Sequence, residues 1–161
     1  MSGEGYKPAN LRLPKSMADR IRADSAQARR FTGGQVLYYL EIALGEWPYI
    51  ITRDTQDRLA VSGEADEKDA VTEEDIRGMA VRFPQAIYTQ IERMASREHR
   101  SFNDQTIYIL ELVFRYWDGI EERRLARDLA QHTRRIESGR GAEELDEDHI
   151  RMPASLALAF A

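Results

Sequence analysis

Leu11-Arg-Leu-Pro14 and Val81-Arg-Phe-Pro84 follow one pattern 70 residues apart, and these two segments decide the fold of the chain. The same offset aligns, without a gap, residues 35–44 (QVLYYLEIAL) with residues 105–114 (QTIYILELVF). Identities at Arg, Pro, Gln, Tyr, Leu and Glu in a single register are hard to explain by two unrelated amphipathic helices. They indicate an internal duplication.

Each copy is predicted to begin with a strand that ends at a proline. Apolar residues alternate with polar or small residues before each proline, which is the period of a strand with one buried face. The apolar positions are Ala9, Leu11 and Leu13 in the first copy and Met79, Val81 and Phe83 in the second. Pro14 and Pro84 end the strands and are suited to open a helix, where a missing N–H costs nothing.

Two helices are predicted after each proline, because apolar residues recur there at spacings of three and four. The stripes are Met17, Ile21 and Ser25, then Val36, Leu40 and Leu44, in the first copy, and Ile87, Ile91 and Met94, then Thr106, Leu110 and Phe114, in the second. Thr32-Gly-Gly-Gln35 and Ser101-Phe-Asn-Asp104 predict a hydroxyl cap at the start of each second helix. Trp47 and Trp117, at matching helix ends, are expected to pack over the core.

Neither copy is expected to fold alone. A single strand has two unpaired edges, and a short two-helix unit buries too little surface to offset chain entropy. About 30 residues separate Trp47 from Gly78, so the second strand can lie antiparallel beside the first within one chain, and the tether favours this over pairing between chains. The predicted fold class is mainly α with a two-stranded antiparallel ribbon, in which two tandem units form an intramolecular pseudo-dimer.

The predicted organisation is a first unit over residues 8–50, an acidic linker over 51–77, a second unit over 78–118, an additional helix over 119–137, an acidic linker over 138–148 and the strand-like start of a third unit over 149–161. The additional helix carries Leu125, Leu129, Thr133 and Ile136 at helical spacing, and self-association through this C-terminal region is expected. Ile150-Arg-Met-Pro153 repeats the strand and proline at an offset of 69, so either the chain stops within a third unit or this segment is an added strand.

The composition indicates the cellular compartment of the protein and limits the kinds of partner it can bind. The chain has 161 residues and no cysteine, which excludes disulfides and thiolate metal sites. A signal-peptide pattern and a membrane-spanning segment are both missing from the sequence, so a soluble cytoplasmic protein is expected. The net charge of -5 is unusual for a nucleic-acid binder. However, residues 1–50 sum to +2 (seven basic, five acidic) and residues 51–77 to -5 (four basic, nine acidic), so the negative charge lies largely in the linkers.

In its two strand–proline–helix segments the chain resembles the ribbon-helix-helix family, in its Arc-like branch. Asn10-Leu-Arg-Leu-Pro14 resembles the family's strand and helix-opening proline, and Ser101-Phe-Asn103, 17 residues after Pro84, resembles the start of its second helix. The resemblance covers about residues 8–47 and 78–117. It implies a bacterial, sequence-specific DNA-binding protein, a transcriptional repressor or a conjugation or plasmid accessory protein, whose ribbon enters the major groove of double-stranded DNA.

The resemblance also implies which side chains read DNA bases, on the outer face of the ribbon. The candidate readers are Asn10, Arg12, Ala80 and Arg82. Arginine can bind guanine through two hydrogen bonds, asparagine can pair with adenine, and alanine can touch the methyl group of thymine. Pro8 and Gly78 share this face but have no hydrogen-bonding side chain. Because the two halves differ, an asymmetric operator is expected.

The family holds DNA phosphates on backbone N–H groups at the start of the second helix, where free amides and the helix dipole attract anions. The matching residues are Thr32, Gly33, Gly34, Ser101, Phe102 and Asn103. Gly33 and Gly34 permit a close approach of the backbone. Asp104 stands in the same turn of the second copy, and there the sequence departs from the family because this charge opposes phosphate binding.

The alternative function is a protein-interaction or antitoxin-like module, in which the same fold dimerises and binds a protein partner. Gly78, Asp104 and the net charge favour this alternative, whereas the paired outward arginines favour DNA. The sequence contains no recognisable nucleophile elbow, phosphate loop or catalytic carboxylate pair, so no enzyme activity, cofactor or small-molecule substrate is expected. His99, His132 and His149 are too widely separated to predict a metal site.

Overall fold

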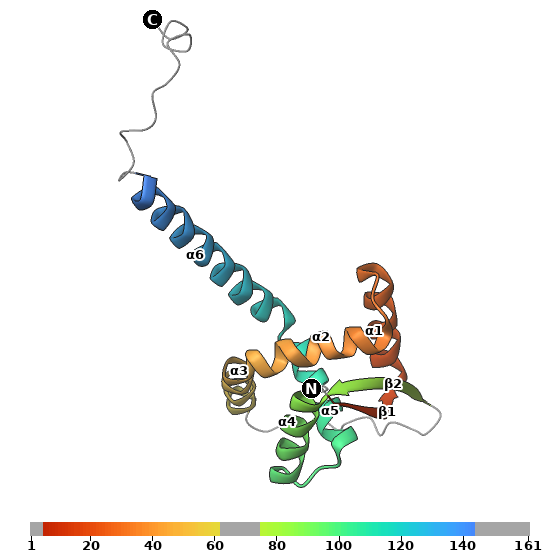
Figure 1. The fold of residues 1–161 in the computed structure, drawn as a ribbon. Helices are drawn as coiled ribbons and strands as arrows, with labels where there is room; N and C mark the ends of the chain where they lie inside the picture. The colour runs from red at the N-terminus through yellow and green to blue at the C-terminus, as the bar shows by residue number, and fades with distance from the viewer. Residues whose placement is uncertain (1–4, 62–74, 144–161) are drawn as a thin grey trace, which may run out of the picture. The chain divides into compact units, whose positions relative to one another are not determined.

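A strand followed by helices occurs twice along the chain. The computed structural model describes residues 5–61 and 75–143, which contain two strands and six helices (Figure 1). In chain order they are β1 (Tyr6–Pro14), α1 (Lys15–Ala28), α2 (Thr32–Gly45), α3 (Trp47–Ala60), β2 (Ile76–Pro84), α4 (Gln85–Arg97), α5 (Phe102–Arg115) and α6 (Trp117–Glu143). The protein is therefore mainly helical with one two-stranded antiparallel sheet, as the sequence predicts. One compact unit ends at Ile120, and the described residues from Glu121 to Glu143 belong to another.

The two strands, together called the ribbon, pair over their whole length within one chain. Asn10 lies opposite Ala80, so the pairing is centred on residues that are themselves 70 positions apart. The buried side chains of the inner face are Leu11, Leu13, Met79, Val81 and Phe83. A register shifted by one residue would place these apolar side chains opposite outward-facing ones, so burial of the inner face determines the register. The predicted antiparallel pairing is confirmed.

Each proline ends its strand and leads directly into a helix. Pro14 and Pro84 have nearly the same backbone angles, with φ of -54° and ψ of 142° and 139°, and each immediately precedes the first helical residue. The first helix of each copy also ends alike, because Arg29 and His99, 70 positions apart, both have a φ of 54°. This left-handed conformation ends the helix and turns the chain toward the next one.

The second helices, α2 and α5, start at equivalent positions but are capped differently. Ser101 caps α5 as predicted, because its hydroxyl accepts a hydrogen bond from the backbone N–H of Asp104 at 3.0 Å. The predicted cap at Thr32 is wrong: Thr32 is the first helical residue of α2, and Phe31, which has no accepting side-chain atom, occupies the cap position. The 70-residue offset aligns Phe31 with Ser101, so the hydroxyl cap is present in only one copy.

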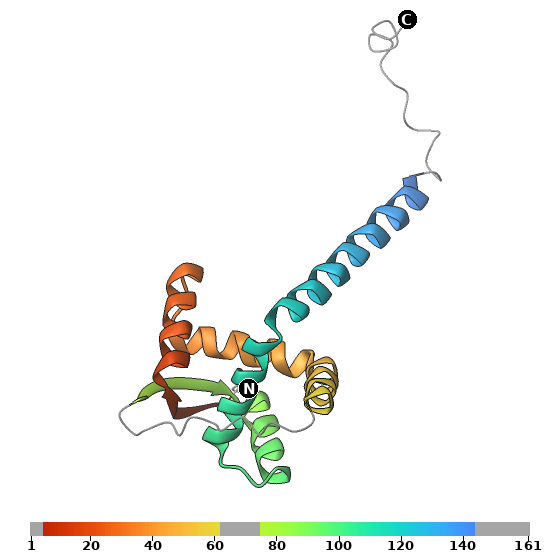
Figure 2. The ribbon, with the colours of Figure 1, turned by 180° about the vertical axis from the view of Figure 1, so that it is seen from behind.

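The two copies share one core. Burial along residues 31–50 matches that along residues 101–120 except at two pairs, Glu41 with Glu111 and Ile42 with Leu112. In both views α2 extends from the ribbon to α3 (Figure 1, Figure 2).

Each tryptophan packs on a tyrosine of the other copy. The rings of Trp117 and Tyr38 are 6.5 Å apart, as are those of Trp47 and Tyr108. Both tryptophans lie against the core, as predicted.

The predicted linker at residues 51–77 is shorter than expected. Residues 51–60 belong to α3, whose Ile50 is fully buried, as is the matching Ile120 in the first turn of α6. The sequence of α3 is mostly polar, so its apolar periodicity is weak and its packing only emerges in three dimensions. None of the helices in the described ranges is long and apolar enough to cross a membrane.

The additional helix predicted over residues 119–137 lies within α6, which runs from Trp117 to Glu143. Residues 138–143 were expected to begin the second linker, but they continue this helix. The rest of that linker and the predicted third unit at residues 149–161 lie outside the described residues.

A buried carboxylate attaches α3 to the second copy. Asp54 is only 4% exposed and accepts hydrogen bonds from Arg58 at 2.8 Å and from Arg115 at 3.3 Å. The hydroxyl of Tyr116 lies 3.3 Å from Asp54 and donates to Asp57 at 2.9 Å. A buried carboxylate with several donors is stable where an unpaired one would be costly.

Stability is expected to fall between pH 10 and pH 12. Burial and the hydrogen bond to Asp57 raise the pKa of Tyr116 to about 12, and burial and the hydrogen bond to Asp24 raise the pKa of Tyr39 to about 12. Above the ordinary tyrosine pKa of about 10 the unfolded chain loses these protons while the folded chain keeps them. The unfolded state then binds fewer protons, so the free energy of unfolding decreases as pH rises.

Urea unfolding followed by circular dichroism at neutral pH, near pH 10 and near pH 12 measures this decrease. The variant Tyr39→Phe plus Tyr116→Phe should show a shallower loss than the original chain. Tyr6→Phe, which removes the hydroxyl of an exposed tyrosine of β1, is the matched control for the substitution itself. An identical slope in the double variant would contradict the assignment.

Candidate nucleic-acid interface

The structure brings all four predicted base readers onto one exposed face of the ribbon. The outward pairs are Pro8 with Arg82, Asn10 with Ala80, and Arg12 with Gly78. Every one of these side-chain positions is exposed. One arginine therefore lies toward each end of the face, and the smaller Asn10 and Ala80 lie at its centre.

The two ends of this face differ in chemistry. At the Arg12 end, the amide of Asn10 lies close over Gly78: a Cβ on that glycine would be 3.5 Å from the Asn10 Oδ1 atom. This is an ordinary van der Waals distance, so the Asn10 amide lies in contact range of Gly78, the residue paired with Arg12. A guanidinium and an amide, the groups suited to guanine and adenine, are thus grouped in one half of the ribbon.

At the other end, Arg82 lies over an aromatic ring. Its guanidinium carbon is 5.5 Å from the centre of the Tyr6 ring, and Tyr6 is 51% exposed. An aromatic face attracts a guanidinium and limits its motion without occupying its N–H donors. Tyr6 was missed as a site residue because the strand was predicted from residue 8, although the alternation of Pro8, Asn10 and Arg12 extends back to it.

A helix start lies along each outer edge of the ribbon. Beside β2, Gly33 in the first turn of α2 approaches so closely that a Cβ there would be 3.1 Å from the carbonyl oxygen of Ala80. Beside β1, the side chain of Asn103 accepts a hydrogen bond from the backbone N–H of Arg12 at 2.8 Å. It also donates to the Arg12 carbonyl at 3.1 Å. The Asn103 side chain thereby pairs both backbone groups of Arg12 at the outer edge of β1.

The side chains predicted at the phosphate sites mostly have structural roles. The ring of Phe102 stacks on the ring of Tyr88, with 4.4 Å between their centres, and its centre is 5.3 Å from that of the Phe83 ring. The Phe102 ring therefore packs against the core. The hydroxyl of Ser101 caps α5, and the amide of Asn103 is bound to β1. What these residues offer an anion is therefore their backbone.

Free backbone N–H groups are more numerous at the start of α2 than at the start of α5. Within the described part of the chain, the backbone N–H groups of Thr32, Gly33 and Gly34 have no hydrogen-bond acceptor. At α5 the same holds for Phe102 and Asn103, whereas the N–H of Asp104 is already bound to Ser101. Such first-turn groups, at the positive end of the helix dipole, are suited to phosphate oxygens.

An arginine precedes each of these helix starts and is held in the same way in both copies. Arg30 donates to Gln35 at 3.3 Å and lies 4.1 Å from the centre of the Tyr38 ring. Arg100 donates to Gln105 at 3.2 Å and lies 4.0 Å from the Tyr108 ring. Positive charge is thus placed near both helix starts, where it adds to their attraction for anions.

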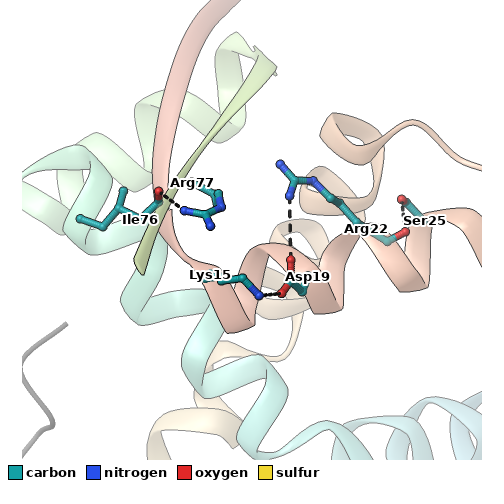
Figure 3. A network of polar contacts seen from close by, with 6 residues as sticks. All are labelled: Lys15, Asp19, Arg22, Ser25, Ile76 and Arg77. Atoms are coloured by element: carbon teal, nitrogen blue, oxygen red, sulfur yellow. Dashed lines mark hydrogen bonds and ion pairs between the residues drawn. The ribbon is translucent and has the colours of Figure 1, made fainter. Parts of the chain in front are cut away.

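Basic side chains from α1 and β2 gather at the Arg12 end of the ribbon (Figure 3). Asp19 pairs with Lys15 at 2.8 Å and with Arg22 at 3.9 Å, and Arg77 donates to the carbonyl of Ile76 at 3.1 Å. The hydrogen bond from Lys15 lowers the pKa of Asp19, and the charges of Arg22 and Arg77 act in the same direction. The cations Lys15, Arg22 and Arg77 outnumber the carboxylates Asp19 and Asp75 at this end of the ribbon, so its net charge is positive.

The corresponding surface of the second copy is closer to neutral. Gln85 and Thr89, at the positions that match Lys15 and Asp19, hydrogen-bond to each other at 3.1 Å. Lys7, which matches Arg77, lies 4.6 Å from the centre of the Tyr88 ring. The Arg12 end is therefore the more basic half of the ribbon.

Comparisons of this chain with models of known protein families, with characterised proteins and with solved structures found no match. In the described ranges, His, Asp and Glu side chains do not form a group of three or more that could hold a metal ion.

Gly33 and Gly34 are expected to respond differently to substitution by alanine. Alanine favours a helix over glycine by up to about 1 kcal/mol. Gly34 has open space for a Cβ, so Gly34→Ala should raise the free energy of unfolding by about 0.5 kcal/mol. Gly33→Ala should instead lower it by about 1 kcal/mol, because its Cβ would press on the backbone of Ala80.

Urea unfolding of the two variants measures this difference, with Gly34→Ala as the matched control in the same helical turn. Equal effects at both positions would mean that α2 does not approach the ribbon as closely as the structure places it.

Proposed function

We propose that this protein is a sequence-specific DNA-binding protein of the ribbon-helix-helix type, with its two tandem units forming an intramolecular pseudo-dimer. The observation that carries the proposal is the exposed ribbon face, on which equivalent arginines, Arg12 and Arg82, lie at opposite ends. The helix start beside each edge of the ribbon supports it. A two-stranded ribbon fits the major groove of DNA, where each base pair presents a distinct pattern of donors and acceptors.

In the proposed complex the outer face lies against base edges. Arg12 and Arg82 each bind a guanine through two hydrogen bonds, Asn10 pairs with an adenine, and Ala80 contacts a thymine methyl group. The free N–H groups at the starts of α2 and α5 hold phosphates on either side of the groove. These phosphate contacts set the position of the ribbon, and the side chains of its outer face select the sequence.

The two halves of the proposed operator differ. The half under Arg12 and Asn10 has two hydrogen-bonding readers and the basic group around Asp19, whereas the half under Arg82 and Ala80 has one. We therefore infer that the operator is not a palindrome and that its Arg12 half contributes more of the affinity. Occupying such a site would block other proteins from it, which is the action expected of a repressor.

The decisive experiment selects binding sites from random duplex DNA at moderate salt. The original chain should enrich a defined sequence. Arg12→Ala and Arg82→Ala should each weaken binding to it by about 5- to 150-fold, since a bidentate arginine–guanine contact contributes about 1–3 kcal/mol. Arg93→Ala, which removes an exposed arginine of α4 away from the ribbon face, is the matched control and should leave the selected sequence unchanged.

Failure to enrich any sequence would overturn the proposal, as would enrichment that persists in the Arg12→Ala plus Arg82→Ala variant. Circular dichroism of each variant would establish that it is folded. The first result would favour the protein-interaction alternative, whereas the second would mean that the ribbon arginines do not select the sequence.

Asn10→Ala tests the asymmetry of the operator separately. This variant should lose the preference for adenine in one half-site only, with the guanine preferences and the other half-site retained. Repeating the site selection with the variant measures this loss at each position. A change spread evenly over both halves would contradict the placement of Asn10 beside Gly78.

A further inference from the structure

Helix α6 carries an apolar stripe that nothing described in the chain covers. Leu125 is 62% exposed, Leu129 is 59% exposed and Ile136 is 47% exposed. Apart from the half-buried Arg124, every residue from Glu121 to Gly139 is exposed. An unaccompanied helix is only marginally stable in water, and most helices gain stability by packing an apolar face.

The stripe has the spacing of a coiled-coil seam. Leu125, Leu129, His132 and Ile136 follow one another at intervals of four, three and four residues. Steps of three and four residues alternate in a coiled-coil seam, where they keep a narrow line of side chains facing one partner helix. Charged residues surround the line on the rest of the helix, so a single helix is the occupant that fits.

We propose that this stripe binds α6 of a second copy of the chain in the antiparallel direction. The proposed layers place Leu125 against Ile136 of the second copy and Leu129 against His132 of the second copy, and each layer occurs twice by symmetry. In this arrangement His132, the one polar residue of the stripe, faces Leu129 of the other chain in both layers that contain it. A parallel arrangement would place His132 against itself.

Charge complementarity selects the antiparallel direction. Asp128 and Arg135 lie on the same flank of the stripe, seven residues apart, and the described residues give neither of them an ion-pair partner. In the antiparallel register Asp128 meets Arg135 of the second copy, and this contact also occurs twice. In a parallel pair Asp128 would lie beside Thr133 instead. The opposite flank of the stripe carries the small Ala126 and Thr133, which allow the helices to approach.

Sedimentation velocity of the full chain without DNA tests the pairing, and it does so independently of the proposed function. The original chain should be a dimer that dissociates on dilution, and Leu129→Glu should be a monomer. Asp128→Arg and Arg135→Asp should each raise the dissociation constant about tenfold, because two attractive contacts become repulsive. The combined variant, Asp128→Arg plus Arg135→Asp, should restore the original value.

Engineered thiols test the direction of the helices, which is straightforward because the chain has no cysteine of its own. A mixture of Leu125→Cys chains and Ile136→Cys chains should form the mixed disulfide on oxidation, while neither variant alone should cross-link. A monomer at every concentration, dimers that survive Leu129→Glu, or cross-linking of Leu125→Cys with itself would each overturn the proposal. Failure of the combined charge variant to recover dimerisation would overturn the proposed register.

Discussion

The pairing of β1 with β2 is the interaction on which the rest of the structure depends. Among the described residues each strand has only the other as a partner in the sheet, and their shared inner face supplies Leu11, Leu13, Val81 and Phe83 to the core. Without this pairing both strands would leave backbone groups unsatisfied, and neither set of helices would have an apolar surface to cover. The pairing joins segments about 70 residues apart, so the entropy of closing that loop must be offset by the common core.

Within this shared core the two copies have diverged. In the first copy Tyr39 donates to Asp24 at 2.5 Å, and Gln35 lies nearby. The matching residues of the second copy, Ile109 and Met94, are apolar, and there the Nε2 atom of the buried Gln105 has no hydrogen-bond partner among the described residues. Both copies therefore have the glutamine, but only the first copy has the polar neighbours Asp24 and Tyr39. The ribbon differs in the same way, with Asn10 on one strand and Ala80 on the other.

The ribbon face and α6 have separate consequences for function. The ribbon presents a guanidinium toward each end and a helix start along each edge, a combination suited to the phosphates and base edges of DNA. The acidic balance of the whole chain does not oppose this, because the basic side chains around Asp19 are local to one end of the ribbon and opposing charges farther away are screened by salt. The part of α6 from Glu121 onward belongs to a different compact unit, and its apolar stripe points to pairing between chains.

The sequence by itself determined the strands, the prolines that end them, the helices that follow and the face on which Asn10, Arg12, Ala80 and Arg82 lie, because strand and helix periods are local properties of the chain. Only the tertiary structure decided the roles of the Asn103, Phe102 and Asp54 side chains. The backbone N–H groups of the first two are predicted to hold phosphate, while the Asn103 side chain binds the backbone of Arg12 and the Phe102 ring packs against the core. Asp54 stabilises a helix expected to be linker. These roles depend on contacts between residues 14 to 91 positions apart, which no local pattern encodes.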